Sequence, residues 1–210
     1  MRRSLVPSWY RCIITFVPKR VDRDLRRREI TDAVIRITVK GGLGSATFRE
    51  VAAEAGVSVR LVQYYFGTKD QLLLATQRRV AERSIERIRR HQAGADPTPR
   101  DRIRTIMRSF VPVDEESRDA MLVYVALFTA SLLDPALRRE EAGEVPASMQ
   151  HVFAQHLRQA RLRPGVDPDK EALILLMIVT GVSQGVLDGQ ITATDAFATI
   201  DYALDRAIRA

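Results

Sequence analysis

Apolar side chains recur along almost the whole chain at the three- and four-residue spacing of an amphipathic helix. The clearest stripe is formed by Ile30, Ala33, Val34 and Ile37. No segment shows the alternating pattern of a half-buried strand, and no two-residue hairpin signal occurs. The chain has 210 residues, of which 46% are hydrophobic, and this is enough to bury a core. The sequence therefore predicts an all-α protein.

Capping residues, prolines and glycines mark the ends of the predicted helices. Thr47 begins a Thr-Phe-Arg-Glu capping box, Gly56 follows as a left-handed residue that ends a helix, and Ser58 can cap the next one. Pro99 and Pro168 stand at first helical positions. These signals predict helices over residues 22–40, 48–54, 58–66, 68–91, 99–111, 114–133, 146–162, 168–188 and 193–209.

Positive charge is concentrated in the N-terminal part of the chain. Residues 1–93 contain 20 Lys and Arg against 9 Asp and Glu, whereas residues 94–210 contain 13 against 17. A basic segment suits a polyanion, because neutralising phosphates releases the counterions that surround nucleic acid. The mildly acidic remainder argues against a protein that coats nucleic acid or membrane with its whole surface. The distribution favours one part that contacts DNA and one that does not.

Cysteine content and hydropathy predict a reducing cytoplasm and no membrane association. Cys12 is the single cysteine, which excludes an internal disulfide framework. Pro7 and Arg11 interrupt the apolar stretch that a signal peptide requires, and we expect no run that is apolar and long enough to cross a bilayer. Residues 1–21 are expected to form a disordered arm. The first sixteen of them would be absent from the native protein if translation starts at Val17.

The residue types of an enzyme or a metal site do not form a recognisable pattern. The histidines are His91, His151 and His156, and the last two are five residues apart, so they do not share a helix face as metal ligands would. A nucleophile elbow, a phosphate loop and zinc-ligand spacing are also missing from the sequence. We therefore expect neither catalysis nor a metal or other cofactor.

Two short helices joined by a tight turn at Gly56, and braced by the helix before them, predict a helix-turn-helix. This arrangement allows the second helix to enter a DNA major groove while the first lies across the backbone. A generic helical corner with solvated basic side chains is the alternative, because look-alikes of this motif are common.

The second helix of this motif has an outer face suited to reading base pairs. Placing Val62 and Phe66 toward the core also puts Val59 on the core side. The side chains left on the outer face and its flanks are Arg60, Leu61, Gln63 and Tyr64. A guanidinium suits guanine, an amide suits adenine, an apolar group suits the thymine methyl, and a phenol suits a phosphate. The helix N-termini at Thr47 and Ser58, together with Lys69, would hold further phosphates.

Residues 22–73 resemble the N-terminal domain of the TetR family of bacterial regulators. The segments that carry the resemblance are Arg26-Arg27-Arg28-Glu29-Ile30, the Gly42 break, Thr47-Phe48-Arg49-Glu50-Val51-Ala52, Ala55-Gly56-Val57-Ser58 and Tyr65-Phe66-Gly67-Thr68-Lys69-Asp70-Gln71-Leu72-Leu73. The resemblance implies that Thr47, Ser58, Tyr65 and Lys69 hold phosphates and that Val59, Arg60, Leu61 and Gln63 face bases. Many members carry Tyr where this chain has Gln63, so an operator sequence does not transfer from them.

The resemblance also implies a domain organisation and a mechanism. Helix signals and a composition break at residues 94–99 separate residues 22–67, a connector helix over 68–93, and residues 94–210. The resemblance implies that the first part is the helix-turn-helix domain and the last a ligand-binding and dimerisation domain. Residues 128–138 look like the ligand domain of the choline-responsive betaine-pathway repressors. The implied protein is a homodimeric repressor that binds a palindromic operator in double-stranded DNA and is released from it by a small molecule. A ligand-free DNA-binding adaptor, or an activator, remains the alternative.

Two sets of residues in the C-terminal half are candidates for these functions. Large or polar groups on otherwise apolar helices predict a ligand pocket formed by Phe110, Tyr124, Phe128, Met149, Phe153, His156, Met177 and Gln184. Apolar stripes on the last two helices, beside Gly181 and Gly185, predict a dimer interface formed by Val179, Val182, Val186, Phe197, Ile200, Leu204 and Ile208. Both patterns also occur in ordinary cores.

Overall fold

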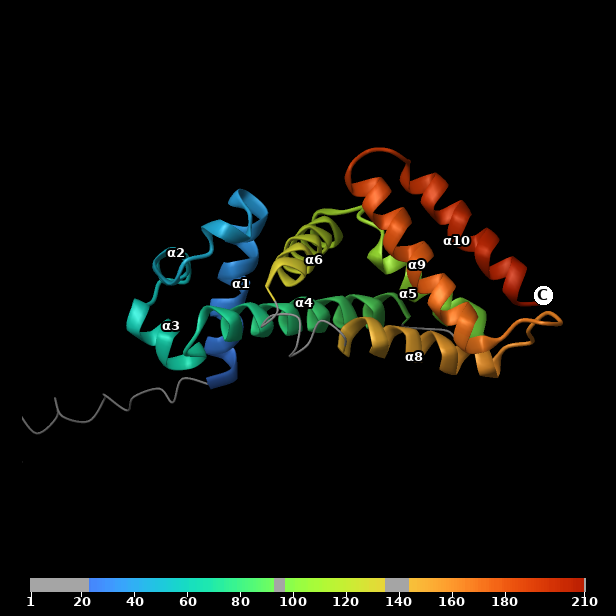
Figure 1. The fold of residues 1–210 in the computed structure, drawn as a ribbon, viewed down its shortest axis with the longest axis horizontal. Helices are drawn as coiled ribbons and strands as arrows, with labels where there is room; N and C mark the ends of the chain where they lie inside the picture. The colour runs from blue at the N-terminus through green and yellow to red at the C-terminus, as the bar shows by residue number, and fades with distance from the viewer. Residues whose placement is uncertain (1–22, 93–96, 135–143, 210) are drawn as a thin grey trace, which may run out of the picture.

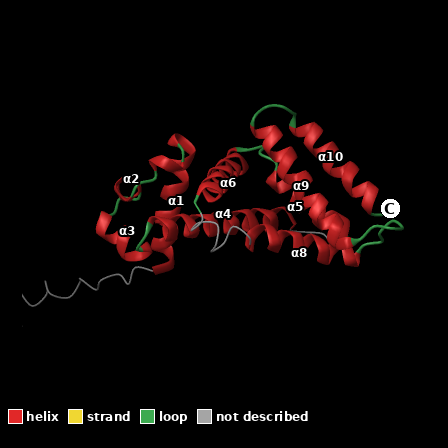
Figure 2. Ribbon diagram, in the orientation of Figure 1, coloured by secondary structure: helices red, strands yellow, loops and turns green. Residues whose placement is uncertain are grey.

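The computed structural model describes residues 23–92, 97–134 and 144–209. The predicted all-α class is confirmed, and Figure 2 shows helices joined by loops in the part of the chain that the structure describes. The expected arm over residues 1–21 lies outside the described residues. The elements are α1 Arg23–Gly41, the 3₁₀ turn η2 Leu43–Ser45, α2 Phe48–Glu54, α3 Val59–Phe66, α4 Lys69–Gln92, α5 Pro99–Phe110, α6 Glu115–Leu133, α8 Glu144–Gln159, α9 Pro168–Leu187 and α10 Ala193–Ala207.

The helices end within a few residues of their predicted limits, and the largest difference has a clear cause. Helix α8 ends at Gln159 and α10 at Ala207, although helices were expected to reach residues 162 and 209. The residues after both helices pair with each other instead. The backbone N–H of Arg163 donates to the Ala207 carbonyl at 3.0 Å, and that of Arg209 donates to the Arg161 carbonyl at 2.7 Å. This short antiparallel contact holds the C-terminus against the α8–α9 loop.

Two hydrophobic cores lie at opposite ends of the molecule, with α4 running between them (Figure 1). One core is built around α1, α2, α3 and the start of α4, and its central side chains are Ile30, Val34, Val51, Val62, Phe66 and Leu72. The other is built from α5, α8, α9 and α10, and its central side chains are Ile103, Met107, Phe153, Leu157, Leu175, Ile200 and Leu204.

Helix α6 connects the two ends. It belongs to the predicted C-terminal domain, yet Val123 and Leu127 are buried in the core that α1, α2 and α3 form. The same helix also packs against α4, α5 and α9. The core of the N-terminal unit therefore extends beyond residues 22–67 and is completed by side chains from the C-terminal half.

Helix α9 is the most apolar element and changes one expectation from the sequence. Its length and composition, with a mean hydropathy of 1.5 over eighteen residues, would suffice to span a bilayer, contrary to the expectation that no such run exists. Buried core helices pass the same test of length and composition. Ala172, Leu175 and Val179 of α9 lie in the second core, while the opposite side of the helix is exposed.

Candidate nucleic-acid interface

Local hydrogen bonds fix the helix-turn-helix where the sequence predicts it. The Thr47 hydroxyl accepts from the Glu50 backbone N–H at 3.2 Å and caps α2, and the Ser58 hydroxyl accepts from the Leu61 N–H at 3.2 Å and caps α3. Gly56, between the helices, has a φ of 64°. A residue with a side chain would be strained in this left-handed conformation, so glycine is required for the turn.

The outer face of α3 is largely as the helical spacing predicts. Val62 and Phe66 are buried, Arg60 and Gln63 are exposed, and Tyr64 is 69% exposed. The Tyr64 side chain is therefore accessible to a phosphate, as the sequence predicts. The side chain of Leu61 lies half-buried at the edge of this face.

Val59 is the residue of α3 for which the two lines of sequence reasoning disagree. Helical spacing from Val62 and Phe66 places it on the core side, whereas the family resemblance places it toward bases. The structure leaves Val59 38% exposed, so its assignment to the core is wrong. Val59 lies in the first turn of α3, before the packed contact at Val62. Facing the same side of the helix as Val62 is therefore not enough to bury its side chain.

The residues expected to hold phosphates lie around this face in different environments. Thr47, Ser58 and Lys69 are exposed. Lys69 begins α4 directly after the turn that ends α3. Tyr65 is half-buried, and its ring packs against the core while meeting the Tyr64 ring edge-on at 5.4 Å. Its role as a phosphate contact stays a prediction.

Two arginines of α1 that were not predicted as site residues lie against the C-terminal half of α3. Arg27 donates from Nη1 to the Tyr65 carbonyl at 2.7 Å, and its guanidinium lies 4.7 Å from the centre of the Phe66 ring. One turn earlier, the Arg23 guanidinium lies 5.9 Å from the centre of the Tyr64 ring. The four-residue spacing of Arg23 and Arg27 places them on one face of α1, and this was the available signal in the sequence. It could not identify their partners, which lie about forty residues further along the chain.

The predicted pocket residues are dispersed over four helices. Phe153 is fully buried in the second core, and Phe110 and Met149 are half-buried against it. Phe128 and Met177 are about half exposed, at 46% and 56%. Tyr124 and Phe128 of α6 do form a pair, with nearly parallel rings 6.1 Å apart. Burial raises the pKa of the Tyr124 hydroxyl above its ordinary value.

The two remaining predicted pocket residues are polar and half-buried. His156 lies on α8, where burial, followed by the charge of Arg102, lowers the pKa of its imidazole. Gln184 lies near the end of α9.

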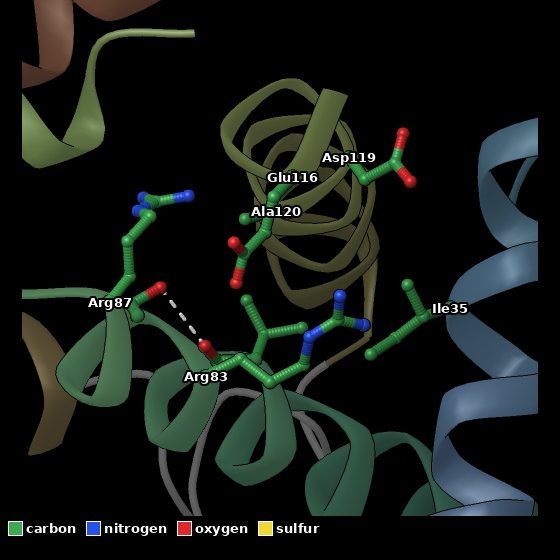
Figure 3. A pocket seen from close by; sticks show the side chains of 8 residues that line it. Ile35, Arg83, Arg87, Glu116, Asp119 and Ala120 are labelled. Carbon is green, nitrogen blue, oxygen red and sulfur yellow. Dashed lines mark hydrogen bonds between the residues drawn. The ribbon is translucent and has the colours of Figure 1, made fainter. Parts of the chain in front are cut away.

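A small cleft among the described residues lies elsewhere, where α1, α4 and α6 meet (Figure 3). It is lined by Ile35, Val80, Arg83, Ser84, Arg87, Glu116, Asp119 and Ala120, and none of the eight predicted pocket residues is among them. Its volume of about 10 Å³ has room for about one water molecule.

This cleft is a charged junction between helices rather than a chamber for a metabolite. Arg87 is buried and donates to the Ser109 carbonyl, and its burial lowers the pKa of the guanidinium. Burial, followed by the charge of Glu115, raises the pKa of the Asp119 carboxyl. Nearby, Arg90 pairs with Glu116 at 3.0 Å and joins α4 to α6.

Burial corrects four of the seven predicted dimer residues, and the other three stay a prediction. Val179, Ile200, Leu204 and Ile208 lie in the chain's own core and have almost no surface to offer a partner, and Val182, Val186 and Phe197 pack half-buried against that core. The side chain that Gly185 lacks would meet Ile191 of the same chain at 3.2 Å, so this glycine serves an internal contact. Each of these helices has two apolar sides, and the spacing does not tell which one turns inward.

The opposite sides of α9 and α10 carry the apolar side chains that remain exposed. They are Leu173, Ile174 and Met177 on α9 and Tyr202 on α10. On α9 they continue to Gly181, which is exposed and has no atom within 4 Å of the position that a Cβ would occupy. The sequence contained these residues, but spacing alone gave them no preference over the buried stripe.

Sequence comparisons match two separate parts of the chain. Residues 30–76 match the family described as bacterial regulatory proteins of the tetR family, and residues 99–209 match the BetI-type transcriptional repressor C-terminal domain. The HTH-type transcriptional regulator BetI of Burkholderia thailandensis is 33% identical over 141 residues, which cover 67% of this chain and 68% of that protein. PksA of Bacillus subtilis, also an HTH-type transcriptional regulator, is 28% identical and covers 80% of this chain and 81% of its own length.

Solved structures show the same fold. A TetR-family transcriptional regulator from Rhodococcus superposes with a TM-score of 0.77 at 24% identity, covering 86% of this chain and 97% of its own. A regulator from Saccharomonospora viridis, solved in complex with choline, gives a TM-score of 0.71 at 20% identity, with coverage of 89% and 100%. The relatives are DNA-binding regulators and not enzymes. This chain belongs to the TetR family of bacterial transcriptional regulators, among the members that carry a BetI-type C-terminal domain.

Proposed function

We propose that this protein is a homodimeric, cytoplasmic repressor that grips a palindromic operator and is released from it by a small-molecule effector. The observation that carries the proposal is the outer face of α3. Arg60, Gln63 and Tyr64 are exposed there beside the open phosphate-binding candidates Ser58 and Lys69. An arginine and a glutamine on an exposed recognition helix suit the major-groove edges of guanine and adenine.

The exposed apolar faces of α9 and α10 support the homodimer. Leu173, Ile174, Met177 and Tyr202 would be covered by the same face of a second copy, as in an isologous four-helix interface. A two-fold dimer would present two α3 helices to DNA, and a palindromic site matches that symmetry when its half-sites are about one helical turn apart.

The position of α6 supports release by an effector. Val123 and Leu127 belong to the core of the DNA-binding unit, whereas Tyr124 and Phe128, each one residue further on, form the stacked aromatic pair. A ligand bound at that pair would act directly on the helix that completes the DNA-binding core. Stacked aromatic faces suit a quaternary ammonium group, and choline is therefore the first ligand to test.

Footprinting of the purified protein on DNA, including its own upstream region, tests operator binding. We expect a palindromic footprint. Arg60→Ala should lose discrimination at one base pair in each half-site, by about 1–3 kcal/mol. Lys69→Ala should weaken every sequence alike and lower the salt slope by about one unit. If the two variants behave identically, the assignment of the α3 reading face is wrong.

A thermal-shift titration with choline, followed by the same footprint in its presence, tests the effector. We expect a rise in the melting temperature together with loss of the footprint, because the ligand must prefer the released state. Tyr124→Leu should remove both effects, and Leu133→Ala, which changes an exposed side chain at the end of the same helix and outside the aromatic pair, should keep both. Stabilisation without release would contradict induction, and no response to any metabolite-like ligand would favour the ligand-free adaptor.

A further inference from the structure

Arg27 joins α1 to the end of α3 by a contact that bridges 38 residues of sequence. Its Nη1 donates to the Tyr65 carbonyl at 2.7 Å, and its guanidinium lies over the ring of Phe66, at 4.7 Å from the ring centre. Phe66 is itself buried in the core. The arginine therefore contacts both the backbone and a core side chain in the last turn of α3.

The Tyr65 carbonyl is one of the acceptors that a helix C-terminus leaves without an intrahelical partner. Neighbouring acceptors are satisfied locally, since Gly67 donates to the Gln63 carbonyl at 2.8 Å and Thr68 donates to the Phe66 carbonyl at 2.7 Å. Arg27 supplies a charged donor from another helix. A cation is also favoured there because the negative end of the helix dipole lies at the C-terminus.

The orientation of α3 depends on few contacts. The helix has eight residues, and only Val62 and Phe66 of them are buried. A helix of this length is not stable by itself, so its direction depends on the packing of Val62, Phe66 and Tyr65 and on what holds its two ends. The Ser58 cap and the turn before it hold the first end. Arg27 and the Gly67 turn hold the second.

We propose that Arg27 is a positioning residue, which fixes the tilt of α3 against α1 and so sets the accuracy of base reading without contacting DNA. The inference rests on the proposed role of α3 as the reading helix. Base-edge hydrogen bonds require donor–acceptor distances within a few tenths of an ångström, whereas contacts to the flexible, uniformly charged backbone tolerate a small tilt. Loss of the clamp should therefore weaken specific binding selectively.

The test compares Arg27→Met with Arg26→Met. Methionine keeps an apolar stem over Phe66 but removes the charged donor. Arg26 precedes Arg27 on α1 and pairs with Glu29 of its own helix at 2.6 Å, so its replacement removes the same charge without touching α3. Affinities are measured for the footprinted operator duplex and for an unrelated duplex of equal length, at several salt concentrations, with folded protein verified by circular dichroism.

We expect Arg27→Met to bind the operator about tenfold more weakly, with unrelated DNA and the salt slope nearly unchanged. Arg26→Met should retain the specificity ratio. Equal weakening on both duplexes with a salt slope lower by about one would instead make Arg27 a phosphate contact and overturn the proposal. An unchanged specificity ratio with a lower melting temperature would reduce Arg27 to a structural role and also overturn it.

Two further measurements keep the result interpretable. If Arg27→Met does not fold, Arg27→Gln replaces it, because a neutral and shorter side chain also loses the clamp and must show the same selective loss. If the wild-type protein shows no preference for any duplex, or if Arg60→Ala keeps full discrimination, the proposed role of α3 fails independently of Arg27.

Discussion

Replacing Leu127 by alanine should destabilise the DNA-binding unit, although the residue lies in the C-terminal half of the chain. Leu127 is 8% exposed and packs in the core that contains Ile30 and Val34 of α1. The substitution removes about three buried methyl or methylene groups, worth about 2.4 kcal/mol at about 0.8 kcal/mol each. The cavity that remains adds to this cost, so the expected total is about 3 kcal/mol, within the usual range for such changes.

Hydrogen exchange measured residue by residue is the appropriate assay, because it reports where stability is lost. A loss of about 3 kcal/mol corresponds to roughly a hundredfold faster exchange of the protected α1 amides. Amides of α8, which belongs to the other core, should change less. Leu133→Ala is the matched control, since this leucine ends the same helix but is 83% exposed, and its replacement should change stability by less than about 0.5 kcal/mol.

The reasoning would be refuted if the α1 amides of Leu127→Ala exchanged as slowly as those of the wild type. In that case α6 would not stabilise the DNA-binding unit, and the proposed route from effector to DNA would lose its structural support. Faster exchange of the α8 amides alone would likewise show that Leu127 does not stabilise the DNA-binding unit.

Two other outcomes follow from the surface and from the helix caps. Met177→Glu places a charge on the exposed apolar side of α9 and should convert the proposed dimer to a monomer in sedimentation analysis. Ile85→Glu on α4 should leave the dimer intact. A dimeric Met177→Glu protein would place the interface elsewhere. The Thr98 side chain donates to Asp101, which holds the pKa of that carboxyl below its ordinary value of 3.8. The ionised Asp101 carboxyl thus stabilises the folded protein fully above pH 3.8, and this contribution is lost as the pH falls through the lowered pKa. Asp101→Asn should therefore make the loss of stability below about pH 4 less steep in acid-unfolding measurements, and an unchanged acid limb would contradict this.

Ion pairs also join α4, the connector helix, to α1 and to α6. Arg79 joins α4 to Asp32 of α1 with two hydrogen bonds, at 2.9 and 3.3 Å, and both side chains are mostly buried. Further along the same helix, Arg90 joins α4 to Glu116 of α6. The connector is therefore fixed to α1 of the DNA-binding unit near its middle and to α6 near its end.

The sequence by itself determined those features that depend on residues close together along the chain. The caps at Thr47 and Ser58 and the left-handed turn at Gly56 are made by hydrogen bonds and backbone angles within three or four residues. For the same reason the helix-turn-helix, the exposure of Arg60 and Gln63 and most helix limits were predictable, whereas the ends of α8 and α10 depend on pairing between distant residues. The concentration of positive charge in the first 93 residues needed no structure either.

Only the tertiary structure decided which of several apolar or charged faces met which partner. Helical spacing marked both sides of α9 as apolar, and docking against α8 and α10 turned Val179 inward while leaving Met177 exposed. Leu127 packs with core residues of α1 that lie about ninety residues earlier in the chain, and Arg27 donates to a carbonyl 38 residues away. Such contacts depend on how whole helices pack together, which the local preferences of neighbouring residues do not specify.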